Sequence, residues 1–146
     1  MDDLLWFIVA DAAGKGSDEG RESDIFYQGK PSLMQFTSKN GLPVNGVMTI
    51  ERDRRGYIWF GTQDGAAVFN GHGISIVNMP NRPASNYIFD ILAATDESIW
   101  FGTNGGGLHR LKNGEWTTFD TRSGLASGEI RVILETGSES GGQVIW

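Results

Sequence analysis

The feature that most constrains this chain is a short aromatic motif that returns at a nearly constant interval. Tyr57–Thr62 reads Tyr-Ile-Trp-Phe-Gly-Thr, and Ser98–Thr103 reads Ser-Ile-Trp-Phe-Gly-Thr, 41 residues later. Shorter copies, Leu5-Trp6-Phe7 and Val144-Ile145-Trp146, stand near the two ends. Four of the five tryptophans therefore occupy one repeat position.

The same interval holds outside the motif, since Ile50, Ile91 and Ile133 are 41 and 42 residues apart. A period slightly above forty, with several short apolar runs in each unit, is typical of β-propeller blades. Helical repeats of similar length would show long apolar patterns at 3.6-residue spacing, which this chain lacks. The sequence therefore predicts an all-β protein of about three four-stranded antiparallel blades, as a partial propeller or as half of an oligomeric ring.

Strand boundaries follow from aligning the repeats. Innermost strands are expected at 47–51, 88–93 and 130–135, each followed by a Trp-containing second strand and then by a hairpin with a tight turn. One domain over 1–146 results, with blade one at 4–37, blade two at 44–78, blade three at 85–120 and the start of blade four at 128–146. Blade one is expected to lack its innermost strand and to place 25–27 between its second and fourth strands.

The repeated aromatic residues are interpreted as core. Neighbouring side chains along a strand point to opposite faces, so Trp and Phe of one motif should pack against different neighbouring blades. An exposed aromatic platform for sugars is the alternative, but a residue repeated in every blade is set by the fold. The predicted core repeat comprises Trp6, Trp59, Phe60, Trp100, Phe101 and Trp146.

Composition excludes several classes of partner. Twelve Lys and Arg against eighteen Asp and Glu give a net charge of −6, and no basic block offsets it, which argues against nucleic acid or an anionic membrane as partner. Cysteine is absent, so no disulfide or thiolate metal site is expected. The apolar run 4–10 is too short to span a bilayer and follows acidic residues, so neither an anchor nor a signal peptide is predicted.

Several spaced elements together resemble the two-component regulator propeller repeat, the sensor blades of hybrid two-component histidine kinases. They are Gly41-Leu42-Pro43, Arg55–Thr62, Phe69-Asn70-Gly71, Ile99–Thr103 and Gly105–Leu108. The resemblance implies an extracytoplasmic, non-enzymatic sensing or interaction module, and many such sensors respond to carbohydrates. It does not extend to a kinase, because no helical dimerisation segment surrounds His72 or His109.

Ligand-binding candidates are expected on one rim of the propeller, in the loops between second and third strands and between blades. Polar side chains there could hydrogen-bond sugar hydroxyls or pair with a carboxylate. The candidates are Asn45, Gln63, Asp64, Arg82, Asn86, Asn104 and Arg122.

No catalytic residues, metal ligands or cofactors are predicted. Asp11–Gly16 resembles a short metal-binding segment of stage-II-sporulation-type phosphatases, but no second element of that family is present, and a polar blade insertion is the preferred interpretation. His72 and His109 are expected at turns or on the surface. Two alternatives stay open: a fragment of a propeller lyase or hydrolase, and a purely structural propeller fragment.

Three blades are fewer than the roughly four to eight that close known propellers. We therefore expect a homo-oligomer, in which the strand 130–134 of one molecule completes blade one of the next and two molecules close a six-bladed ring. The alternative is that the chain is part of a larger propeller.

Overall fold

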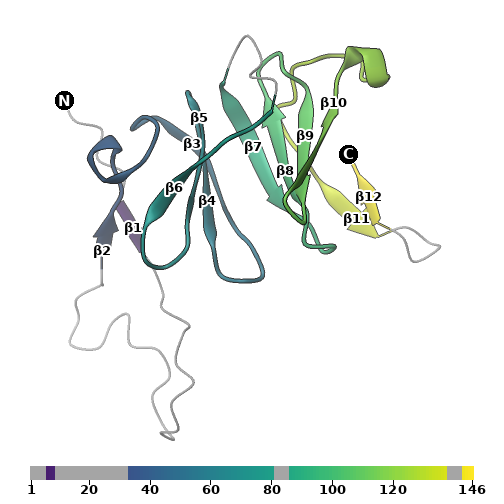
Figure 1. Cartoon of the computed structure of the whole chain (residues 1–146). Helices are drawn as coiled ribbons and strands as arrows, with labels where there is room; N and C mark the ends of the chain where they lie inside the picture. The colour runs from purple at the N-terminus through teal and green to yellow at the C-terminus, as the bar shows by residue number, and fades with distance from the viewer. Residues whose placement is uncertain (1–5, 9–32, 81–85, 138–142) are drawn as a thin grey trace, which may run out of the picture.

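The computed structural model describes residues 6–8, 33–80, 86–137 and 143–146, which form four antiparallel sheets and two short 3-10 helices (Figure 1). The strands are β1 (Trp6–Ile8), β2 (Leu33–Gln35), β3 (Val47–Arg52), β4 (Ile58–Thr62), β5 (Gly65–Phe69), β6 (Ile74–Val77), β7 (Ile88–Ala93), β8 (Ile99–Thr103), β9 (Leu108–Lys112), β10 (Glu115–Phe119), β11 (Glu135–Gly137) and β12 (Gln143–Ile145). The helices are η2 (Ser38–Asn40) and η3 (Thr121–Ser123). The prediction of an all-β fold built from propeller blades is confirmed.

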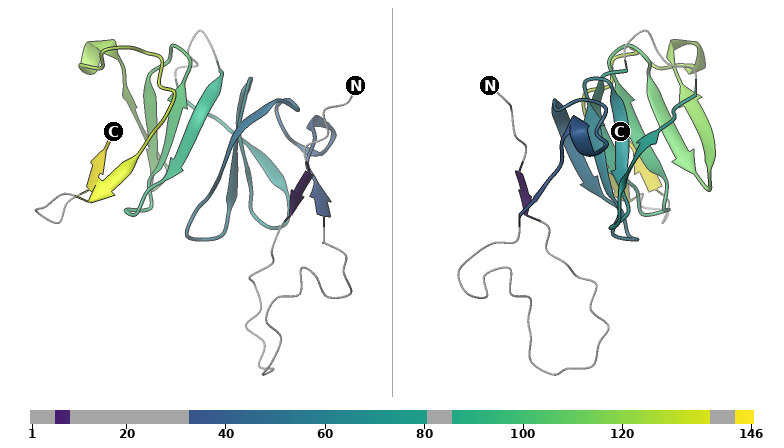
Figure 2. Two further views of the ribbon diagram at one scale, coloured as in Figure 1. Left: turned by 180° about the vertical axis from the view of Figure 1, so that it is seen from behind. Right: turned by 60° about the vertical axis from the view of Figure 1, so that its left-hand side comes forward.

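Two of the sheets are complete blades, with strand orders β3-β4-β5-β6 and β7-β8-β9-β10. Consecutive strands pair because tight turns join them. The β9–β10 turn is Asn113-Gly114, with φ of 52° and 82°, which is the backbone geometry that Asn-Gly favours in hairpins. The four sheets follow one another across the molecule in chain order (Figure 2), and the innermost strands β3 and β7 lie next to each other.

The interface between the two complete blades contains the repeated aromatic residues. Trp59 of β4 is 5% exposed and meets Phe101 of β8 edge to face, with ring centroids 5.8 Å apart. Phe60, the next residue along β4, instead packs against Phe36 on the other face of blade two, at 5.3 Å. Trp100 likewise turns away from Phe101 and packs against Ile133. The predicted alternation of faces is therefore confirmed for both motifs.

The glycine of each motif allows the innermost strand of the following blade to approach. A Cβ at Gly61 would stand 2.8 Å from Cγ2 of Ile88, and one at Gly102 would stand 2.7 Å from the carbonyl oxygen of Ile130. Ile88 and Ile130 occupy equivalent positions in successive repeats. Close packing between blades thus explains the repeated Trp-Phe-Gly-Thr sequence.

Two strand predictions need correction. Residues 131–134 are not a strand, and β11 begins only at Glu135, although Leu134 and Trp146 exchange both backbone hydrogen bonds and so extend the β11–β12 ladder by one pair. In blade one, β1 pairs directly with β2 rather than across a third strand. The predicted third strand, 25–27, lies outside the described residues.

Trp146 was expected in the core, and the structure corrects this, because its side chain is 72% exposed. The face beside β12 is an apolar groove of about 400 Å³, lined in part by Trp100, Phe119 and Ile145, and no described strand covers it.

Trp6 lies in β1, where its backbone pairs with Gln35. Among the described residues, no helix has the length and apolarity that crossing a membrane requires.

Candidate functional site

One end of the blades collects the turns that follow the second strands. The turn after β4 is tied to the start of β3, because Gln63 N donates to the Gly46 carbonyl at 3.1 Å. The turn after β8 is tied in the same way to the start of β7, because Asn104 N donates to the Tyr87 carbonyl at 3.0 Å. This repeated contact defines a rim, made of the second-to-third-strand turns and the first residues of the innermost strands.

Two of the predicted rim residues meet at a cavity. Asn86 Nδ2 donates to Asp64 Oδ1 at 3.0 Å, although 22 residues separate the two in sequence. Both line a cavity of about 190 Å³, together with Pro43, Asn78 and Met79. A carboxylate, two amides and an apolar wall surround this cavity and provide hydrogen-bond donors and acceptors.

The other rim candidates do not converge on that cavity. Asn45 Oδ1 accepts from Ser38 N at 2.8 Å and so orders the loop before β3. Arg122 pairs with Asp120 of its own turn at 2.7 Å, and its side chain is 91% exposed. Gln63 and Asn104 are exposed on the rim turns. Arg82 lies outside the described residues.

An aromatic pair on the rim was missed by sequence reasoning. Tyr87, which precedes β7, and Phe89, within β7, have ring centroids 4.8 Å apart at an interplanar angle of 50°. Both are partly exposed. An alignment of the repeats could have found this pair. The positions of Tyr87 and Phe89 hold Gly46 and Met48 in the preceding unit, so the common fold does not require aromatic residues there.

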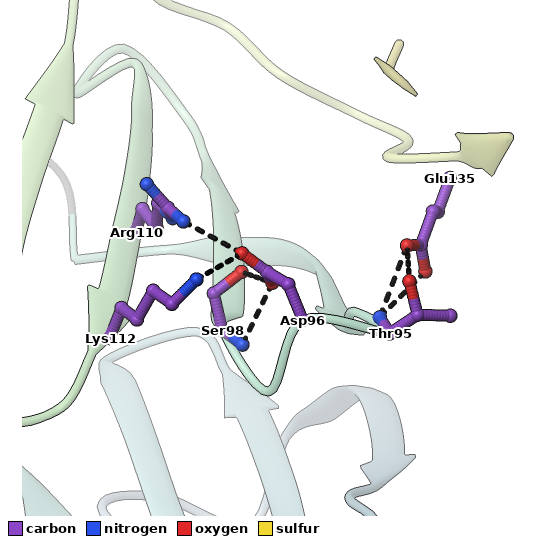
Figure 3. Close-up of polar contacts among 6 residues, drawn as sticks. All are labelled: Thr95, Asp96, Ser98, Arg110, Lys112 and Glu135. Atoms are coloured by element: carbon purple, nitrogen blue, oxygen red, sulfur yellow. Dashed lines mark hydrogen bonds and ion pairs between the residues drawn. The ribbon is translucent and has the colours of Figure 1, made fainter. Parts of the chain in front are cut away.

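The opposite end of blade three holds a charged cluster centred on Asp96, in the β7–β8 turn (Figure 3). Asp96 Oδ2 accepts from Arg110 at 2.8 Å and from Lys112 at 2.6 Å, while Oδ1 accepts from Ser98 N at 3.1 Å and Ser98 Oγ at 2.5 Å. Burial by itself would raise the pKa of Asp96, but the hydrogen bonds from Lys112, Ser98 and Arg110 outweigh it and hold the pKa well below its ordinary range. Every polar atom of the carboxylate is thus engaged, and the cluster clamps the turn to β9.

A second contact at this end joins neighbouring blades. Glu135 of β11 accepts hydrogen bonds from Thr95 N, at 2.9 Å, and from the Thr95 hydroxyl (Figure 3). Because Thr95 belongs to the β7–β8 turn, this contact ties blade three to the β11–β12 hairpin. We interpret this end of the blades as structural.

Two of the motif tryptophans donate their indole N–H to an acceptor at one and the same repeat position. Trp59 Nε1 donates to Asp53 Oδ2 at 3.2 Å, and Trp146 Nε1 donates to Thr136 Oγ1 at 2.8 Å. The equivalent residue for Trp100 is Ala94, and Trp100 Nε1 is buried without a hydrogen-bond partner. The indole contact is thus a repeated stabilising device that blade three lacks.

His109 was expected at a turn or on the surface, and the structure corrects this as well. It is 1% exposed in β9, its Nδ1 lies 2.9 Å from Thr118 Oγ1, and its Nε2 is buried without a partner. Burial lowers the pKa of His109, because desolvation disfavours the charged imidazole. His109 pairs with Phe101 as Ala67, which is fully buried, pairs with Phe60 in the preceding blade. His72 is exposed in the β5–β6 turn, as expected.

Within 6–8, 33–80, 86–137 and 143–146, no three His, Cys, Asp or Glu side chains are grouped so that they could hold a metal ion. The phosphatase-like segment 11–16 falls outside the described residues. What the described residues offer chemically is a small polar cavity and a partly exposed aromatic pair on the same rim.

Comparison with known families and structures confirms the resemblance inferred from the sequence. Residues 41–64 match the family model described as two component regulator propeller. The extracellular domain of a hybrid two-component system from B. thetaiotaomicron is similar in structure, with a TM-score of 0.55 and 27% identity over 78% of this chain and 16% of that chain. A streptogramin B lyase structure is similar in fold, with a TM-score of 0.51 and 18% identity over 80% of this chain and 44% of that one. A search of curated protein sequences finds no match.

Proposed function

We propose that this chain, which carries two-component regulator propeller repeats, is a non-enzymatic sensory module that binds a carbohydrate at its rim. The family match and the similarity to an extracellular domain of a hybrid two-component system support a sensory role. The chain spans 16% of that domain's length. That this chain takes part in the signalling of a whole sensor is therefore part of the proposal.

The observation that carries the proposal is the meeting of Asp64 and Asn86 at the 190 Å³ cavity. Sugar hydroxyls both donate and accept hydrogen bonds, so a carboxylate beside an amide can satisfy neighbouring hydroxyls. The two residues come from different blades. Asn86 has an equivalent in Asn45, but Gly105 stands where the preceding unit has Asp64, so the pair as a whole differs between units. Ligand sites in repeat proteins lie where the units differ, because positions common to all units maintain the fold.

A propeller enzyme is the competing function, and the described residues favour it less. The streptogramin B lyase similarity is at 18% identity and supports the fold alone. His109, the one histidine in the described blade strands, is buried against Thr118, away from solvent. A general base must reach the proton that it removes, and His109 does not offer one at the rim.

Binding is tested by thermal unfolding and titration calorimetry with a panel of neutral mono- and oligosaccharides. We expect one or more sugars to raise the melting temperature of the wild-type chain, because a ligand that binds only the native state stabilises it. Asn86→Ala should reduce that shift, since it removes one side of the cavity. Arg122→Ala is the control, because Arg122 contacts only its own turn. An absence of binding by every sugar in the panel would contradict the proposal.

A further inference from the structure

Two positions, two residues apart, stand at or just before the start of β3 and β7 and at 129 and 131 in the last unit, and the residue types at these positions change from unit to unit. Successive repeats are offset by 41 and 42 residues, which aligns the three pairs. The pairs are Gly46 with Met48, Tyr87 with Phe89, and Glu129 with Arg131. The residue between the members of a pair is aliphatic in all three repeats, as expected for a core position.

Local backbone geometry turns these side chains out of the blade packing. In β3, both Val47 and Thr49 pair with β4 and leave Met48 as an extra residue, and in β7 the same irregularity leaves Phe89 unpaired. A bulge of this kind re-aims the side chain of the extra residue. Met48 is accordingly 43% exposed. Arg131 is not in a strand, and its side chain is 71% exposed.

Direct contacts join the side chains into one surface, here named the inner-strand patch: Met48, Tyr87, Phe89, Glu129 and Arg131. The Tyr87 hydroxyl donates to Met48 Sδ at 3.1 Å. The Arg131 guanidinium lies over the Phe89 ring, 4.9 Å from its centroid, and pairs with Glu129. With the Tyr87–Phe89 ring pair between them, these contacts run without interruption from blade two to the segment before β11.

The patch combines the groups that recognise a sugar ring. Aromatic rings offer flat apolar surface with little rotamer freedom to lose on binding. A guanidinium stacked on a ring keeps further N–H donors at its edge, and the Glu129 carboxylate supplies acceptors. The opposite charges of Arg131 and Glu129 cancel locally, and the chain's net charge of −6 disfavours an anionic ligand, so a neutral sugar fits best.

The patch and the rim cavity are linked along the backbone, because Asn86 lines the cavity and Tyr87 of the patch is the next residue of the chain. We propose that the inner-strand patch stacks one ring of a neutral oligosaccharide whose neighbouring unit occupies the Asp64–Asn86 cavity. This inference rests on the proposed carbohydrate-binding function and specifies the ligand as an oligosaccharide of at least two units.

Titration calorimetry with glucose, mannose, xylose and their linear β-1,4-linked tetramers, alongside maltotetraose and tetragalacturonate, tests the inference. We expect a neutral tetramer to bind more tightly than its monomer. Phe89→Ala and Arg131→Ala should each weaken that tetramer about tenfold or more while leaving monomer affinity unchanged, because only the patch contact is lost. Arg131 is largely exposed, so its substitution leaves the fold intact even if Phe89→Ala destabilises it. Arg122→Ala should bind the tetramer as the wild type does.

The outcomes separate the two proposals. If Asn86→Ala weakens tetramer binding and Arg131→Ala does not, the role of the inner-strand patch is refuted. Carbohydrate binding at the rim cavity is then still supported. Equal affinity for monomer and tetramer would also refute the role of the patch, as would tighter binding of tetragalacturonate than of every neutral tetramer. Failure of every sugar to bind the wild-type chain would remove the carbohydrate function itself, and the patch assignment with it.

Discussion

Replacing Gly61 by Ala should destabilise the protein by about 1 to 3 kcal/mol, the usual cost of overpacking a close-packed interior. A Cβ at this position would stand 2.5 Å from Thr49 Cγ2 and 2.8 Å from Ile88 Cγ2. Ordinary contacts begin near 3.4 Å, so the neighbours would have to move by up to roughly 0.9 Å. Both neighbours are β-branched and stiff, and Ile88 is fully buried in the interface between blades, so neither can turn aside without disturbing β3 or β7.

Urea titration with linear extrapolation measures the change in the free energy of unfolding. Gly73→Ala is the matched control, because a Cβ there meets nothing within 4 Å and its backbone is not in the left-handed region. We expect Gly73→Ala to lie within about 0.5 kcal/mol of the wild type. If both variants lose the same stability, or if Gly61→Ala loses less than about 0.5 kcal/mol, close approach of blades is not the reason for the glycine in the motif.

Three further predictions concern other parts of the molecule. Asp53→Ala should lower the free energy of unfolding by about 2 to 3 kcal/mol in the same urea titration, since it removes the acceptor of buried Trp59 Nε1. Asp53→Asn keeps an oxygen and should lower it less. Equal losses in the two variants would contradict this account. Burial lowers the pKa of His109, so the unfolded chain binds the proton more tightly, and stability that is present above about pH 6.5 should be lost as pH falls below it. His109→Gln should flatten the dependence of the free energy of unfolding on pH between about pH 7 and 5, and an unchanged dependence would refute the assignment. For the expected dimer, light scattering should give twice 16.0 kDa, and a monomer at high protein concentration would contradict it.

Local sequence determined the strands of the two complete blades and the faces of their aromatic residues. Trp59 and Phe60 follow each other on one strand, so alternation assigns them to opposite faces without knowledge of the fold. The 41-residue interval then places the equivalent of each residue in the next blade. Repetition is informative here because each blade packs on copies of itself, and the same side chains are therefore needed at the same positions.

The rim was only partly predictable. Loop polarity identified Asp64 and Asn86 as candidates, but only the packing of successive blades brought them to one cavity. The same reasoning also selected Asn45 and Arg122, which hydrogen-bond within their own loops. Side chains of one type therefore have different roles, and their partners across the chain decide which.

Tertiary structure alone decided the inner-strand patch, the burial of His109 and the missing strand at 131–134. A bulge is set by the register between two strands, so the sequence of one strand does not show that Phe89 leaves the ladder. His109 is buried because it pairs with Phe101 and so shares the sheet face that packs against blade two. Residues 131–134 resemble a strand by composition. Of these four residues, Leu134 alone forms backbone hydrogen bonds with the chain segment of β12, through Trp146. Ladder hydrogen bonds and side-chain burial depend on neighbours distant in sequence, which local periodicity does not specify.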